Sequence, residues 1–134
     1  MADILTVIYE PIFLDCSYGF RPNRDCHQAI KKLDEVIMRG KTNYIVDVDI
    51  KGFFNNVNHD WLIKFLEHEI KDKNFIRYIK RFLIAGIMED GKYYESEVGT
   101  PQGGLISPIL ANVYLHYVLD LWFELYVKIS GREI

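Results

Sequence analysis

The segment Gly99–Asn112 restricts the possible folds more than any other part of this chain, because it joins a glycine-rich polar loop to a helix with its start signals intact. Its sequence is GTPQGGLISPILAN. Ser107 is a favourable N-cap, and Pro108 suits the first helical position. The helix is therefore predicted to begin here, with its free N–H groups facing the loop at an end that favours anions. Gln102 is expected at the mouth of this site.

A second informative segment is predicted to form a buried strand that carries carboxylates to its end. The strand covers residues 43–50, and Asp47 and Asp49 are two residues apart, so both point to the same face. Two carboxylates on one face are costly unless they are paired or bound to a cation, and Mg²⁺ prefers such oxygen ligands. The alternative is that both carboxylates only face solvent at an edge. Together with the glycine-rich loop, the strand indicates a nucleotide and metal site.

The rest of the chain alternates between other predicted elements. Residues 4–22 are expected to form a short extended piece followed by a loop. Asn23 and Asn58 are candidate N-caps, and Gly40 follows the end of the first helix. Asp90-Gly91 is a strong hairpin signal. The last helix is apolar on most sides and should be covered all round. Helices are predicted over residues 24–38, 58–69, 73–85 and 107–129.

Composition and charge limit the class of protein. A 134-residue chain that is 49% hydrophobic can build one globular core, but a net charge of −3 is unusual for a nucleic-acid binder. Arg77, Lys80 and Arg81 nevertheless share a helical face that would suit a phosphate backbone, although such faces are often only solvated. Cys16 and Cys26 lack metal-ligand spacing. Charged residues interrupt the longest apolar runs, so a cytoplasmic protein is expected.

Four linked sequence blocks carry a family resemblance. They are Ser17–Arg24 (SYGFRPNR) with His27–Ile30 (HQAI), Asp49–Phe54 (DIKGFF), His59–Leu62 (HDWL), and Gly99–Gly104 (GTPQGG) with Ser107–Asn112 (SPILAN). In this order they closely resemble the reverse transcriptase domain of bacterial group II intron-encoded proteins, the maturases.

The resemblance implies an α+β fold, a partial right-hand polymerase of fingers and palm in which helices pack on a small sheet with a β-hairpin. Residues 1–134 would form one partial domain, with about 1–42 in the fingers and about 43–134 in the N-terminal palm and fingers. The family's Tyr-x-Asp-Asp motif does not occur in this sequence, which contains no Asp-Asp pair. The chain alone is therefore expected to be inactive and its Mg²⁺ site incomplete.

The same resemblance assigns roles to three neighbouring residues. Asp49 corresponds to the first catalytic aspartate and a metal ligand, and the carbonyl of Ile50 to a second metal ligand. In two-metal phosphoryl transfer, such a carboxylate bridges both ions. Phe54 corresponds to a steric gate that disfavours a 2′-hydroxyl; its alternative is a plain core residue, as is expected for Phe53. Asp47 matches no catalytic position.

Four further residues are expected at the nucleotide. Arg21 and Arg24 resemble fingers residues that approach the triphosphate or template, because guanidinium groups bind phosphate in bidentate fashion. Surface exposure is the alternative for Arg24. Gln102 resembles the glutamine that lines the nucleotide pocket, and Gly103 beside it permits close backbone approach.

The resemblance implies that the parent protein is an RNA-directed DNA polymerase of a group II intron, active in splicing and retrohoming. Its expected partners are Mg²⁺, deoxynucleoside triphosphates, intron RNA, and an RNA template with a DNA primer. The alternatives are another bacterial reverse transcriptase, of the retron, diversity-generating or abortive-infection type, and a truncated relic that binds RNA without polymerising. An open sheet edge and the apolar last helix also predict that the isolated chain forms a homodimer.

Overall fold

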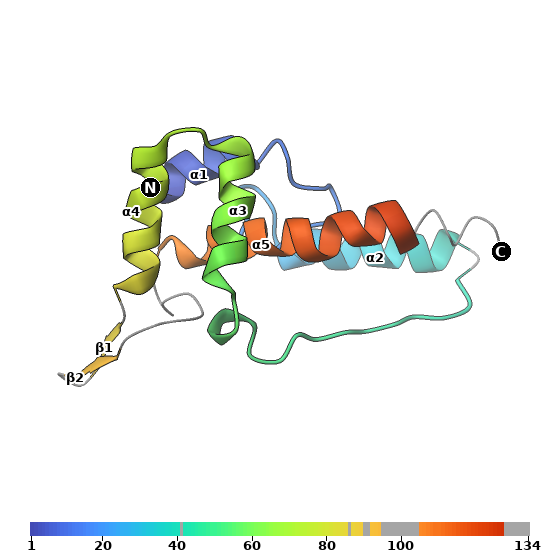
Figure 1. Ribbon diagram of the computed structural model, residues 1–134. Helices are drawn as coiled ribbons and strands as arrows, with labels where there is room; N and C mark the ends of the chain where they lie inside the picture. Colours follow the sequence, from blue (N-terminus) through green and yellow to red (C-terminus); the bar gives the residue numbers. More distant parts are fainter. Residues whose placement is uncertain (41, 86, 90–91, 95–104, 128–134) are drawn as a thin grey trace.

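The computed structural model describes residues 1–40, 42–85, 87–89, 92–94 and 105–127 (Figure 1). Helices dominate these residues. Short elements complete them: a 3₁₀ turn η1 (Phe53–Asn55), two π-helical turns η2 (His116–Asp120) and η3 (Phe123–Val127), and strands β1 (Ile87–Glu89) and β2 (Lys92–Tyr94). The five α-helices are α1 (Ala2–Tyr9), α2 (Cys26–Arg39), α3 (His59–Glu69), α4 (Lys73–Ile84) and α5 (Ser107–Leu115).

The core lies where α1, α3, α4 and α5 meet, at one end of the molecule (Figure 1). Burying one such aliphatic side chain stabilises the fold by roughly 1.5 to 3 kcal/mol. As predicted from their amphipathic patterns, the helices over 58–69 and 73–85 turn their apolar faces toward this core. The side chains with no exposed surface, or almost none, are Leu5, Tyr9, Val57, Leu62, Leu66, Ile79, Leu83, Leu110 and Val113.

Helix α1 replaces the extended piece that the sequence predicted at the start of the chain. Leu5 and Tyr9 are four residues apart on one face, and both are fully buried in the core. The hydroxyl of Tyr9 donates to the carbonyl oxygens of Phe65 and Leu66 at 3.3 and 3.4 Å. Burial raises the pKa of this hydroxyl well above its usual value, so Tyr9 remains a neutral donor. Packing against α3 thus decides the conformation of a short segment.

Side-chain caps begin α2, α3 and α4, but not α5. The predicted cap at Ser107 is wrong, because Ser107 is already the first residue of α5 and Ile106, which has no capping side chain, precedes it. Asn58 caps α3 as predicted, accepting from the backbone N–H of Trp61 at 3.0 Å. Gly40 follows α2, also as predicted. The cap of α2 is Asp25 and not Asn23, because the carboxylate of Asp25 accepts from Gln28 N–H while Asn23 adopts a positive φ of 58°.

The prediction of an α+β fold with helices packed on a small sheet is wrong. Within the described residues the fold is helical, and no helix covers a sheet. The described β-structure consists of one antiparallel ladder, in which Ile87 pairs with Tyr94 and Glu89 with Lys92. The turn residues Asp90 and Gly91 lie outside the described residues.

The predicted strand 43–50 is an extended segment without ladder hydrogen bonds to any described residue. Tyr44 and Val46 are 90% and 84% exposed, although the sequence predicted a buried strand. A β-conformation is stable only when neighbouring strands take up its N–H and C=O groups and cover its apolar side chains. The described part of the chain offers no such neighbour. Figure 1 shows this segment running beside the helices as a simple trace.

Apolar surface remains exposed on α2 and on the turns that follow α5. The first half of the last helix is buried as predicted, but the cover does not continue, because Trp122 and Phe123 are each 51% exposed. On α2, Leu33 and Val36 line a cavity that Phe123 of η3 also lines. Helix α2 and η3 therefore lie side by side at this point (Figure 1). None of the described helices is both long and apolar enough to cross a membrane.

Candidate metal and nucleotide site

Three of the residues predicted from sequence to act in a metal and nucleotide site line one cavity. Its volume is about 460 Å³, and it is open to solvent. Asp49, Ile50 and Phe54 reach it from the end of the extended segment and from η1, and Leu115 closes it from α5. The complete lining is Val48, Asp49, Ile50, Gly52, Phe53, Phe54, Asn55 and Leu115. The structure therefore brings Asp49, Ile50 and Phe54 to the wall of one cavity.

A tight turn at Gly52 gives the cavity its shape. Gly52 has φ of 63°, a left-handed conformation that costs an L-residue about 1 kcal/mol or more. Its carbonyl accepts from Asn56 Nδ2 at 2.7 Å. A Cβ at this position would stand 3.1 Å from the same nitrogen atom. Glycine therefore allows the chain to reverse between Asp49 and Phe54, so that both line the same cavity.

The two adjacent phenylalanines have different surroundings. Phe53 packs against the core, with its ring centroid 6.1 Å from that of Tyr114 on α5. Phe54 makes an edge contact with Phe53 at 5.5 Å and is half-buried. Phe53 thus anchors the turn to the helices, while Phe54 is held by Phe53 at the wall of the cavity.

The cavity offers hard oxygen ligands. Asp49 is the acidic residue among those that line it, Ile50 follows Asp49 directly, and Asp47 does not line the cavity. In the part of the chain that the structure describes, no three side chains of His, Cys, Asp or Glu gather as a metal centre. Mg²⁺ usually takes one or two carboxylates and completes six oxygen ligands with water and substrate phosphates. The donor set fits Mg²⁺ that arrives with a phosphate-bearing substrate.

Arg21 is a buried structural anchor in this structure. Its side chain is 3% exposed and forms an ion pair with Glu10 at 2.8 Å. The guanidinium also donates to the carbonyl oxygens of Leu14 and Ser17 at 2.7 and 2.8 Å, and it lies over the ring of Phe13 at 5.4 Å. Contact with a triphosphate would require these internal bonds to be exchanged for phosphate oxygens.

We expect Arg21→Gln to lower the free energy of unfolding by about 2 to 4 kcal/mol, because it leaves carbonyl groups and Glu10 without their partner. Arg24→Gln is the matched control. Arg24 pairs with the exposed Asp15 at 2.8 Å, so its loss should cost less than about 1 kcal/mol. Urea unfolding followed by circular dichroism measures both. Equal losses in the two variants would contradict the anchoring role of Arg21.

Of the remaining predicted site residues that the structure describes, none lines the Asp49 cavity. Arg24 lies over the ring of Tyr18 at 5.3 Å, in a loop that Asn112 of α5 holds by donating to the carbonyl of Gly19 at 2.7 Å. Gln102 and Gly103 lie outside the described residues. Arg77, Lys80 and Arg81 are exposed on α4, and none of them lines the Asp49 cavity.

Leu115 is a wall residue, far from the others in sequence, that sequence reasoning missed. Its only sequence signal is its place on the apolar helix that follows the glycine-rich loop. A pairing between α5 and the turn at Phe53 cannot be read from periodicity, since it depends on how distant elements pack.

Two comparisons with known proteins bear on this site. A family model described as reverse transcriptase (RNA-dependent DNA polymerase) matches residues 1–129. Group II intron-encoded protein LtrA of Lactococcus lactis subsp. cremoris is 44% identical over 130 residues, which are 97% of this chain and 21% of that protein. An uncharacterized 91 kDa protein in the cob intron of Schizosaccharomyces pombe is 46% identical over 121 residues, covering 90% of this chain and 15% of that protein. The chain thus spans about a fifth or less of these relatives.

Proposed function

Because this chain belongs to the reverse transcriptase (RNA-dependent DNA polymerase) family, we propose that the Asp49 cavity is part of the site at which deoxynucleotides join a DNA primer. The observation that carries the proposal is that Asp49, Ile50 and Phe54 line one open cavity. The parent activity is RNA-directed DNA synthesis by a group II intron-encoded protein in splicing and retrohoming. The similarity to the group II intron-encoded protein of Lactococcus lactis supports that assignment.

The Asp49 carboxylate and the Ile50 carbonyl would hold Mg²⁺ at this cavity. When bound, Mg²⁺ would supply the positive charge that favours a deprotonated primer 3′-hydroxyl and neutralises the triphosphate. Asp49 lies in an open, solvated position, so its carboxylate can bind and orient a hydrated cation without a large desolvation cost. A single protein carboxylate leaves the remaining ligand positions to water and phosphate oxygens.

Phe54 would stand beneath the sugar of the incoming nucleotide. Its ring is fixed by Phe53, which is in turn packed against Tyr114, so the wall cannot yield easily to an extra hydroxyl. This exclusion favours deoxynucleotides over ribonucleotides.

The other assigned residues surround this centre. Gln102 and Gly103 are proposed as the remaining wall of the nucleotide pocket, and Arg21 and Arg24 as cations on the fingers side. Residues of about 1–42 would belong to the fingers and about 43–134 to the palm and fingers. The exposed faces of α2 and of the turns after α5 support self-association of the isolated chain as a homodimer. The bacterial relative supports a cytoplasmic location.

A graft tests the proposed function. This chain would replace the matching 130 residues of the group II intron-encoded protein LtrA, with the unaltered protein as the reference. We expect the graft to extend a DNA primer on an RNA template in the presence of Mg²⁺ and to stop when the metal is chelated. A graft that folds and binds the template but adds no nucleotide would contradict the proposal.

A further inference from the structure

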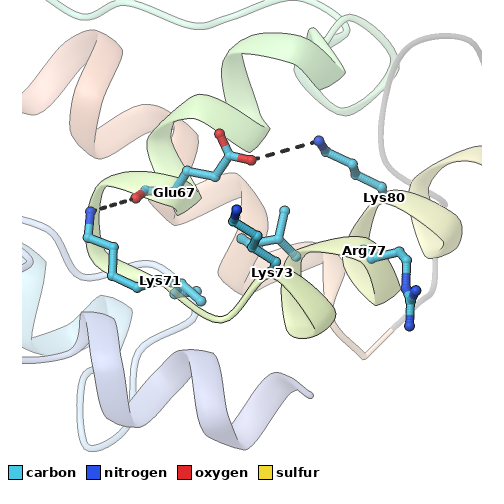
Figure 2. Close-up of a pocket in the computed structure, with 7 residues that line it drawn as sticks. Glu67, Lys71, Lys73, Arg77 and Lys80 are labelled. Carbon is cyan, nitrogen blue, oxygen red and sulfur yellow. Dashed lines mark hydrogen bonds and ion pairs between the residues drawn. The ribbon is translucent and has the colours of Figure 1, made fainter.

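A second cavity, of about 520 Å³, collects positive charge between α3 and α4 (Figure 2). It shares no lining residue with the Asp49 cavity. Its lining contains four cations and one carboxylate, in a chain whose net charge is −3. The lining residues are Glu67, Ile70, Lys71, Lys73, Ile76, Arg77 and Lys80. We refer to this surface as the basic pocket.

Two of the four cations are held by the protein itself. Lys71 donates to the carbonyl oxygens of Glu67 and His68 at 2.9 and 2.7 Å, at the C-terminal end of α3. Lys80 lies 3.8 Å from the carboxylate of Glu67. Figure 2 draws the interactions of Glu67 with both lysines. These interactions fix the rim of the basic pocket and use part of its charge.

The other two cations have no ion pair among the described residues. Lys73 and Arg77 are both exposed, and Figure 2 shows the ammonium of Lys73 pointing between α3 and α4 while the guanidinium of Arg77 points away from Glu67 toward the outside. Arg77 lies 5.8 Å from the ring centroid of Tyr78, an interaction that leaves its N–H groups available. Two cations thus remain able to bind an anion from outside.

The position of Lys73 also disfavours a purely structural role. Lys73 is the first residue of α4, where the helix dipole repels a positive charge. The helix N-terminus is not itself the anion site, because Asp72 accepts from the backbone N–H groups of Asn74 and Phe75 at 2.8 and 3.3 Å. An anion that binds here must therefore be bound by the side chains.

The spacing of the cations selects an extended anion. Lys73, Arg77 and Lys80 are separated by four and three residues, so they lie along one face of α4. Seven residues of helix rise about 10 Å, which is longer than one phosphate group, so the row can contact more than one phosphate along a strand. A single phosphate would engage one end of this row only.

We propose that the basic pocket and the adjoining face of α4 bind the phosphate backbone of RNA, away from the Asp49 cavity and without reading bases. The proposal rests on the proposed function only in its choice of RNA as the nucleic acid. Neutralising phosphates releases counterions from the strand, so this binding must weaken steeply with salt.

The test measures binding of a fluorescently labelled single-stranded RNA to the full 134-residue chain by anisotropy, in EDTA. The double variant Lys73→Gln/Arg77→Gln removes the two available cations. The matched control Lys31→Gln/Arg39→Gln removes the same charge from exposed positions of α2. Urea unfolding verifies that all three proteins are equally folded. Salt is varied from about 50 to about 200 mM, the range in which phosphate neutralisation dominates affinity.

We expect the basic-pocket variant to bind RNA about tenfold or more weakly at about 0.1 M salt. The slope of the logarithm of the binding constant against the logarithm of the salt concentration should be smaller in magnitude by about 1.4. Each phosphate that is no longer neutralised lowers this slope by about 0.7. The control should stay within about twofold of the unaltered chain, because it lies outside the pocket.

Equal weakening in both variants, an unchanged salt slope, or no binding by the unaltered chain would overturn the proposal. So would displacement of the RNA by inorganic phosphate at constant ionic strength. The binding is measured in EDTA, so it does not depend on Mg²⁺ at the Asp49 cavity. If the proposed function of that cavity were wrong, these binding results would be unchanged.

Discussion

Asp49→Asn should reduce RNA-templated DNA synthesis by on the order of 10³-fold in the LtrA graft, while leaving the fold intact. Asparagine keeps the size of the side chain but loses the negative charge that would hold Mg²⁺. Metal-assisted charge stabilisation contributes several kcal/mol to such reactions, and each 1.4 kcal/mol corresponds to about tenfold in rate. The measurement is the rate of primer extension at saturating nucleotide and template.

Asp47→Asn provides the matched control, because it makes the same chemical change two residues away on the same exposed segment. Asp47 does not line the cavity, so we expect extension within about threefold of the graft. Two equally inactive variants would indicate that the segment, and not the Asp49 carboxylate, is required. Full activity of Asp49→Asn would remove Asp49 from the site.

Phe54→Val should raise the incorporation of ribonucleotides relative to deoxynucleotides by roughly 10- to 200-fold. The smaller side chain opens space for a 2′-hydroxyl, and steric differences of this size are worth about 1 to 3 kcal/mol in discrimination. The ratio of kcat/KM values for matched ribo- and deoxynucleoside triphosphates measures it. We expect the deoxynucleotide rate to change much less.

Phe53→Val separates this effect from a general loosening of the turn. Phe53 contacts the core through Tyr114, so its truncation should lower the free energy of unfolding by about 1 to 3 kcal/mol and change the sugar preference much less than Phe54→Val does, because the Phe54 ring is still present. If Phe53→Val also admits ribonucleotides, the selectivity belongs to the shape of the whole turn. If Phe54→Val leaves the ratio unchanged, Phe54 is not the gate.

Helices α3 and α4 were predictable because their signals are local. Asn58 satisfies free N–H groups within its own first turn, and the apolar residues of both helices recur with the helical period. The sequence also predicted that Asp49, Ile50 and Phe54 belong together, since they are separated by only a few residues across a glycine turn. Roles within the cavity came from the family resemblance, and they remain proposals.

The prediction failed where a segment depends on distant partners. Residues 43–50 have the composition of a buried strand, yet they form no ladder with the described residues, because β-pairing requires neighbours that periodicity cannot supply. Helix α1 formed where an extended piece was expected, because Tyr9 reaches the backbone of α3. The ion pair between Arg21 and Glu10 was also not predicted, because the two residues are eleven positions apart and only folding of the segment between them brings them together.

By itself, the sequence determined the family, the two amphipathic helices with their caps, and the short stretch that holds the candidate metal ligand and gate, because each of these is encoded by residues close together in the chain. Tertiary structure alone decided that Leu115 closes the cavity, that Arg21 is buried, and that Lys73 and Arg77 remain available beside the fixed Lys71. These features depend on which distant surfaces come into contact and on which charges already have a partner. Both depend on how the whole chain packs.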